Sequence, residues 1–120
     1  MDIGCRMCLT VYDLPPSFIE HNAFDLKNKL KENTRFGRKE FDVPLDDPIF
    51  SRSAFKGIST VRTLKGKAWK QIGSSGSGNH FVEFGVVEIT KQSNELNVPI
   101  GKYLGILSHS GSRGMGAKIA

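Results

Sequence analysis

The sequence has no long apolar run and contains only two cysteines and five prolines, which excludes several classes of protein. No stretch approaches the length needed to cross a bilayer. The opening residues MDIGCRMCLTVYDL lack the basic and then apolar pattern of a signal peptide. The cysteines at positions 5 and 8 are too close together for a disulfide framework, which argues against a small secreted scaffold. The expected location is the cytoplasm.

What the sequence does contain is ordinary globular material with a basic excess. Its 120 residues are 38% hydrophobic and 24% charged, which predicts one domain with a modest core. The net charge of +5 suits an anionic partner such as nucleic acid or a nucleotide. Glycine outnumbers proline by 13 to 5, which favours tight backbone turns over a proline-rich tail.

The hydrophobic pattern predicts an α+β fold of mixed strands and helices, with candidate metal-binding residues at strand ends. A capping box formed by Ser17 and Glu20 is expected to begin the first helix, and Asp47 followed by Pro48 is typical of another helix start. The predicted strands cover residues 8–14, 80–89 and 103–110, and the predicted helices cover 17–33, 59–72 and a segment running to residue 120.

The first candidate site combines Asp2 with Cys5. A carboxylate and a thiol three residues apart can reach one metal from a tight turn, and a thiolate can bridge two ions. Cys5 and Cys8 also match half of a zinc site or a redox pair. A buried structural cysteine is the alternative interpretation of each thiol.

The second candidate is Asn79-His80, which follows a glycine- and serine-rich stretch. Glycines there allow the backbone to approach a ligand closely, and Asn79 offers a neutral donor to a phosphate oxygen. Phe81 and Glu83 lie two apart on the predicted strand and therefore face one way, where they could stack on a base and accept its N–H groups. Glu83 is not expected to share a metal with His80, because three residues of strand separate them. The alternatives are a core histidine and a core phenylalanine.

The third candidate is SHSGSRGMG, residues 108–116, where a strand ends at His109 and a glycine-rich turn leads to a helix. His109 is placed to ligate a metal, and Arg113 can grip a phosphate with two donors. A plain strand-to-helix turn with a surface arginine is the alternative. The lysine motif of P-loops, the GxGxxG fingerprint and the GxSxG nucleophile elbow do not occur in the sequence.

Three motifs in this order, DIGC, GSGNHFVEF and SHSGSRGMG, closely resemble those of RtcB-type RNA-splicing ligases. The resemblance runs along the whole chain and implies the RtcB-like fold. It also implies an enzyme that uses GTP and two Mn²⁺ ions to join RNA 2′,3′-cyclic phosphate or 3′-phosphate ends to 5′-hydroxyl ends. The RNA ends and GTP are thus the implied partners. In that family a guanylated histidine passes GMP to the RNA 3′-phosphate, and the 5′-hydroxyl then displaces it.

The resemblance also assigns a role to each motif residue. The metal ligands it implies are Asp2, Cys5, His80 and His109, with Cys5 bridging the two ions. The implied nucleotide contacts are Asn79, on phosphate, and Phe81 and Glu83, which hold the guanine nucleotide. Arg113 is the implied contact to RNA or phosphate.

The sequence departs from the family pattern in two respects. Arg6 stands where the family commonly has glycine, which puts the turn after Cys5 in doubt. The guanylated histidine and a further metal-binding histidine lie downstream in the family and have no counterpart here. The chain is therefore expected to be a partial RtcB-like catalytic domain, spanning residues 1–120, that does not complete guanylylation alone.

Two other functions remain open from the sequence. One is a small zinc-binding or thiol-redox module that uses both Cys5 and Cys8. The other is a basic RNA-binding domain without catalysis, whose affinity would depend on salt but not on metal or GTP.

Overall fold

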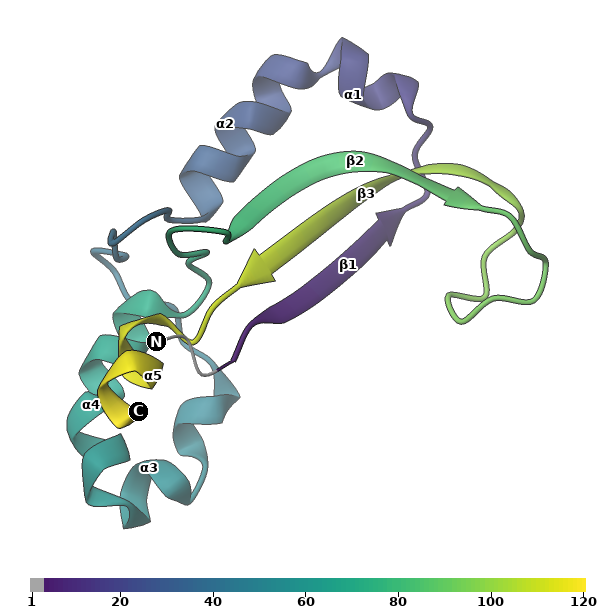
Figure 1. Ribbon diagram of the computed structural model, residues 1–120. Helices are drawn as coiled ribbons and strands as arrows, with labels where there is room; N and C mark the ends of the chain where they lie inside the picture. Colours follow the sequence, from purple (N-terminus) through teal and green to yellow (C-terminus); the bar gives the residue numbers. More distant parts are fainter. Residues whose placement is uncertain (1–3) are drawn as a thin grey trace.

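The computed structural model describes residues 4–120 and has the mixed α+β architecture that the sequence predicts (Figure 1). Asp2 lies outside the described residues. The elements, in chain order, are β1 (Arg6–Tyr12), α1 (Ser17–His21), α2 (Ala23–Asn33), the 3-10 helix η1 (Pro48–Ser51), α3 (Ala54–Gly57), α4 (Ser59–Gln71), β2 (Phe81–Ile89), β3 (Gly101–Ser110) and α5 (Arg113–Ile119).

The strands form a three-stranded sheet in the order β1-β3-β2, and both outer strands run antiparallel to β3. In consequence β1 and β2 begin at the edge where β3 ends. The helices α3, α4 and α5 gather at this same edge, whereas α1 and α2 lie along the sheet (Figure 1). The helices α3, α4 and α5 therefore lie beside the edge of the sheet where the sequence predicts the metal-binding residues.

The three predicted strands and the helix at α4 are confirmed within two residues at each end. The Asp47 cap is also confirmed, since its carboxylate accepts a hydrogen bond of 2.8 Å from the backbone N–H of Ile49. Asp47 thus begins η1 with Pro48 in the first position, as the pairing of these two residues indicates.

The single helix predicted over residues 17–33 is wrong, because the chain breaks at Asn22. There φ is −122° and ψ is 19°, and the Asn22 amide donates to the backbone oxygen of Phe18 at 2.9 Å. An asparagine that binds nearby backbone competes with helix continuation. The capping box is wrong as well: the cap position is Pro16, and in the described part of the chain no side chain caps α1.

The buried part of the molecule is small and unusually polar near the helices α3, α4 and α5. The buried apolar side chains are Phe41, Phe50, Ile89 and Leu104. The buried polar ones, by contrast, all precede or line the glycine-rich stretch that leads to β2; they are Thr34, Gln71, Ser74 and Ser75. Since buried polar groups are stable only when hydrogen-bonded, this region is held together by specific contacts rather than by apolar packing alone.

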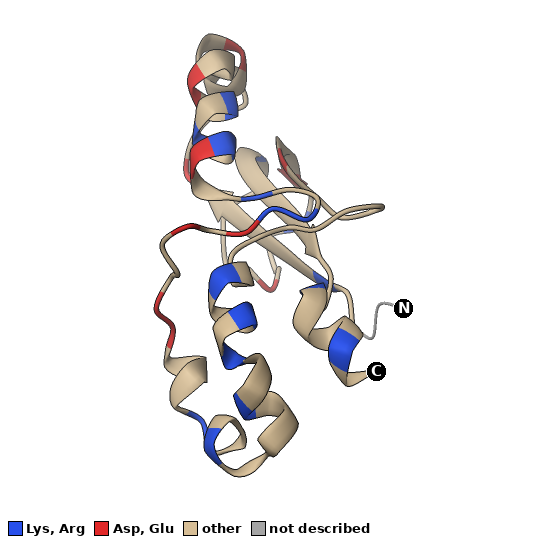
Figure 2. Ribbon diagram, turned by 90° about the vertical axis from the view of Figure 1, so that its left-hand side faces the viewer, with Lys and Arg blue, Asp and Glu red and all other residues tan. Residues whose placement is uncertain are grey.

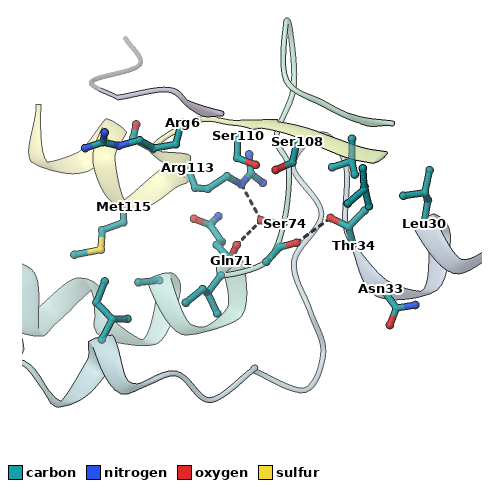
Figure 3. Close-up of a pocket in the computed structure, with 18 of the residues that line it drawn as sticks. Arg6, Leu30, Asn33, Thr34, Gln71, Ser74, Ser108, Ser110, Arg113 and Met115 are labelled. Carbon is teal, nitrogen blue, oxygen red and sulfur yellow. Dashed lines mark hydrogen bonds between the residues drawn. The ribbon is translucent and has the colours of Figure 1, made fainter. Parts of the chain in front are cut away.

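A cavity of about 860 Å³ lies between one face of the sheet, α2 and α4. Its sheet wall is made by Val82, Phe84 and Ile106, and Figure 3 shows Arg6, Ser74 and Arg113 among its polar lining. Neither α4 nor any other described helix is long and apolar enough to cross a membrane.

Candidate metal centre

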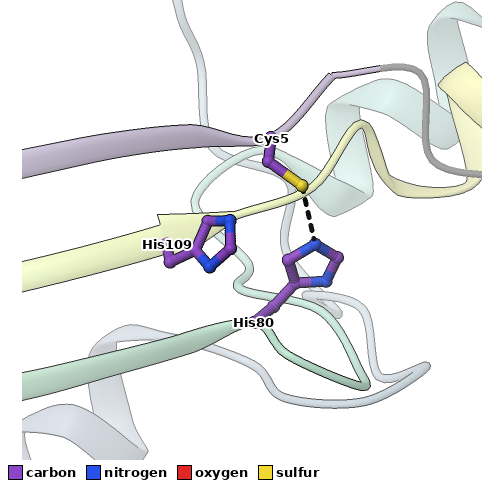
Figure 4. Close-up of side chains that lie close together, drawn as sticks. All are labelled: Cys5, His80 and His109. Atoms are coloured by element: carbon purple, nitrogen blue, oxygen red, sulfur yellow. Dashed lines mark hydrogen bonds between the residues drawn. The ribbon is translucent and has the colours of Figure 1, made fainter.

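Cys5, His80 and His109 come together at the sheet edge where β1 and β2 begin and β3 ends (Figure 4). One possible ligand atom from each lies within 4.8 Å of those of the other two. Cys5 Sγ is 3.5 Å from His80 Nε2. The sheet topology explains why these residues lie together. Cys5 and His80 directly precede the first residues of β1 and β2, and His109 is next to the last residue of β3, at the same edge of the sheet.

The rings of the two histidines are in contact, and one of them has a fixed orientation. Their centroids are 5.3 Å apart at an interplanar angle of 79°. Nδ1 of His109 lies 3.1 Å from the backbone oxygen of Asn79. A carbonyl oxygen only accepts, so this hydrogen bond requires the proton on Nδ1, and the neutral ring then keeps its lone pair on Nε2. Donation of one ring N–H to a backbone carbonyl is what metal-ligating histidines usually do.

These donors fit a divalent metal. One thiol and two imidazoles offer a mixed sulfur and nitrogen set of the kind that transition metals and zinc accept. The cluster is half-buried at both histidines and exposed at Cys5, so an ion and an exchangeable ligand can enter. The structure thus supports a possible metal site built from Cys5, His80 and His109.

Cys8 does not belong to this cluster. It pairs with Ser108 across the sheet, whereas His109 pairs with the neighbouring Met7. Successive side chains of a strand point to opposite faces, so Cys8 faces away from His109. The geometry therefore disfavours a site that uses both cysteines, and neither of the two forms a disulfide.

Phe81 and Glu83 lie on one face of the sheet, as their spacing predicts, and the strand pairing shows that His109 lies on the same face. Phe81 pairs directly with His109, and the two rings are 5.7 Å apart in an edge-to-face arrangement. Glu83 is exposed and pairs with Leu107 one step further along the same face. Asn79 is exposed on the loop just before His80. The aromatic ring and the carboxylate are thus aligned beside the cluster.

Arg113 is turned inward rather than toward open solvent (Figure 3). Its Nε donates to the Ser74 hydroxyl at 2.8 Å and Nη2 donates to the backbone oxygen of Gly37 at 2.9 Å. The arginine itself has a φ of +54°, in the left-handed region that few side chains adopt. The expected contact to RNA or phosphate stays a prediction, with these hydrogen bonds already in place.

The glycine-rich stretch allows the His80 and Arg113 side chains to pack closely against its backbone. A Cβ on Gly76, whose φ is +131°, would lie 2.6 Å from His80 Nδ1 and 2.9 Å from Arg113 Nη1. The close approach expected from the glycines is therefore to the histidine and arginine side chains themselves. The sequence pattern pointed to the glycines of this stretch as a group but not to Gln71 or Ser74, although the place of these two between a helix end and His80 was the available signal.

The comparison with protein families is consistent with this geometry. Residues 51–120 match the family described as tRNA-splicing ligase RtcB, and the matched region includes His80, His109 and Arg113 but not Cys5. No curated protein and no solved structure matched the chain. Because the family match covers more than half of the sequence, the chain belongs to the RtcB family of RNA ligases.

Proposed function

We propose that this chain forms part of the catalytic domain of a GTP- and Mn²⁺-dependent RNA ligase that joins 2′,3′-cyclic phosphate or 3′-phosphate ends to 5′-hydroxyl ends. The observation that carries the proposal is the Cys5, His80 and His109 cluster in a chain that matches the RtcB family. Residues 1–120 are the partial domain.

Within the proposal Cys5, His80 and His109 would hold Mn²⁺, with Asp2 as a further ligand. A bound divalent metal supplies Lewis-acid polarisation of phosphate oxygens and a template for the reacting groups. His109 contributes Nε2, because its Nδ1 proton is held by the Asn79 backbone. The chain's other groups bind and orient the phosphate-bearing partners.

The guanine nucleotide is proposed to lie on the sheet face next to the cluster. Phe81 offers a ring for stacking, and Glu83, two residues further along, offers acceptors for base N–H groups. Asn79 is placed to donate to a phosphate oxygen from the loop. Arg113, whose guanidinium lies beside His80, is proposed to contribute positive charge to an RNA phosphate.

The charge distribution favours RNA as the larger partner. Residues 48–82 contain six lysines and arginines and no acidic residue. Figure 2 shows α4 with basic positions along its length and no acidic one. These basic residues are Arg52, Lys56, Arg62, Lys65, Lys67 and Lys70. Such a surface attracts a phosphate backbone without reading its sequence.

A direct test measures GTP binding by the 120-residue chain in equilibrium dialysis, with and without Mn²⁺. Binding is expected only with Mn²⁺ and is expected to be lost on Phe81→Ala. Labelled GTP is expected to dissociate on denaturation, because the family's guanylated histidine has no counterpart in this sequence. Metal-independent GTP binding, or covalent labelling of a histidine, contradicts the proposal.

A second candidate, metal-independent RNA binding, rests on the same basic α4. It predicts salt-sensitive RNA affinity that is unchanged by Mn²⁺, by GTP and by Cys5→Ala. Titration of a labelled single-stranded RNA with a 3′-phosphate, with and without Mn²⁺, separates the two functions.

A further inference from the structure

Gln71, the last residue of α4, has a buried polar side chain and is not one of the candidate metal ligands. It links three separate segments of the chain. It is only 6% exposed. Its amide oxygen accepts a hydrogen bond of 2.9 Å from the backbone N–H of Gly114 in α5. Its amide nitrogen donates to the Glu40 carboxylate at 2.8 Å. Both polar atoms of the amide are therefore hydrogen-bonded, the oxygen as an acceptor and the nitrogen as a donor.

The backbone of Gln71 holds a third segment, the glycine-rich loop. Its carbonyl oxygen accepts from the backbone N–H of Ser74 at 3.1 Å and also from the Ser74 hydroxyl. That hydroxyl in turn accepts from Arg113 Nε at 2.8 Å (Figure 3). Gln71 and Ser74 thus connect the loop that leads to His80 with the turn that follows His109.

This connection meets a physical need of the site. Residues 73–78 include three glycines and three serines, a composition that leaves a free chain highly mobile. Ordering backbone residues costs conformational entropy, so a loop that is already fixed loses less entropy when a ligand binds. A site whose ligands are prearranged by buried hydrogen bonds binds its metal more tightly.

We propose that Gln71 is a positioning residue of the metal centre. Its side-chain amide fixes the start of α5, and its backbone carbonyl fixes the glycine-rich loop. These contacts keep His80 and His109 close enough to bind one ion. The inference rests on the proposed function only in taking Cys5, His80 and His109 as metal ligands.

The test uses Co²⁺ as a spectroscopic probe of the 120-residue chain, because a thiolate bound to cobalt gives a charge-transfer absorption band. Gln71→Met keeps the side-chain length and removes both amide hydrogen bonds. We expect its Co²⁺ affinity to fall by roughly tenfold, the lower end of the loss seen when outer partners of metal ligands are removed. An affinity and a band equal to those of the wild-type chain overturn the inference.

A charge swap separates positioning from general structural damage. In Gln71→Glu the new carboxylate faces Glu40, so we expect a loss at least as large as in Gln71→Met. In Gln71→Glu combined with Glu40→Gln, the amide of residue 40 donates and the carboxylate of residue 71 still accepts from Gly114. Recovery of the wild-type affinity supports the inference, and a double variant as weak as Gln71→Glu overturns it.

The matched control is Asn94→Ala. The Asn94 amide also makes partly buried hydrogen bonds, to the backbone N–H and oxygen of Val98 at 3.2 and 2.7 Å, but it lies in the loop between β2 and β3. Its Co²⁺ affinity is expected to equal that of the wild-type chain, and an equal loss in both variants overturns the inference. A wild-type chain without the band overturns the metal centre itself and the inference with it, whereas a normal band in Gln71→Met overturns only the inference.

Discussion

His109 Nδ1 lies 3.1 Å from the backbone oxygen of Asn79, the residue directly before His80. One histidine of the candidate metal centre is therefore oriented by the peptide that carries the other. Displacement of the glycine-rich loop is therefore expected to move His80 and to disturb the orientation of the His109 ring. This relationship makes the loop and its anchors the most informative places to perturb.

Cys5→Ala is expected to abolish metal binding, whereas Cys8→Ala is expected to leave it unchanged. Cys5 lies in the cluster and Cys8 faces the other side of the sheet. Removal of a ligand is expected to lower Co²⁺ affinity by more than about 100-fold, the upper limit for the loss of an outer partner. Isothermal titration calorimetry with Co²⁺ makes the comparison, because it measures affinity in both variants whether or not a thiolate is bound. Equal losses in the two variants contradict the assignment and favour a site that uses both thiols.

Gly76→Ala is expected to damage the site through a specific clash. The added Cβ meets His80 Nδ1 at 2.6 Å, and the φ of +131° adds backbone strain. We expect the free energy of unfolding to fall by about 1–3 kcal/mol and the metal affinity to fall with it. Urea denaturation and Co²⁺ titration measure the two effects.

The control for Gly76 is Gly78→Ala in the same loop. Its φ is +73°, yet no atom lies within 4 Å of the added Cβ. Its cost is limited to the left-handed backbone, about 1–2 kcal/mol, and its metal affinity should remain that of the wild-type chain. A Gly76→Ala variant whose metal affinity matches that of Gly78→Ala speaks against the packing role of Gly76.

Asp47→Ala is expected to destabilise the chain without altering the metal centre. The Asp47 carboxylate caps η1 at Ile49, and loss of such a cap costs about 0.5–2 kcal/mol. Thermal unfolding followed by circular dichroism measures the loss. Asp47→Asn keeps an accepting oxygen at the cap and is expected to recover most of the stability; a variant as unstable as Asp47→Ala argues against the cap.

Replacing exposed basic residues of α4 by alanine is expected to weaken RNA binding and to make it less dependent on salt. Arg62 and Lys70 are exposed on this acid-free helix. For each RNA phosphate that a variant no longer neutralises, the slope of log K against log salt should fall by about 0.7 for single-stranded RNA. Lys27→Ala on α2, a helix that also carries acidic residues, is the control. An unchanged slope in Arg62→Ala and Lys70→Ala places the RNA elsewhere.

Much of the local structure could be predicted from the sequence because its causes are local. The alternation around Phe81 and Glu83 predicts a strand with both side chains on one face, and the register confirms it. The Asp47-Pro48 pair marks a helix start, and its cap hydrogen bond is present. The predicted helix over residues 17–33 failed at Asn22, where a side-chain hydrogen bond to the Phe18 backbone competes with the helix.

The sequence by itself determined which chemistry was available: two thiols, three imidazoles, a glycine-rich stretch and a basic helix. Only the tertiary structure decided which of these groups meet. The antiparallel order β1-β3-β2 brings Cys5, His80 and His109 to one edge and turns Cys8 away, because strand pairing fixes the face of every side chain. The part played by Gln71 depends on contacts 31 and 43 residues away along the chain, which no local pattern encodes.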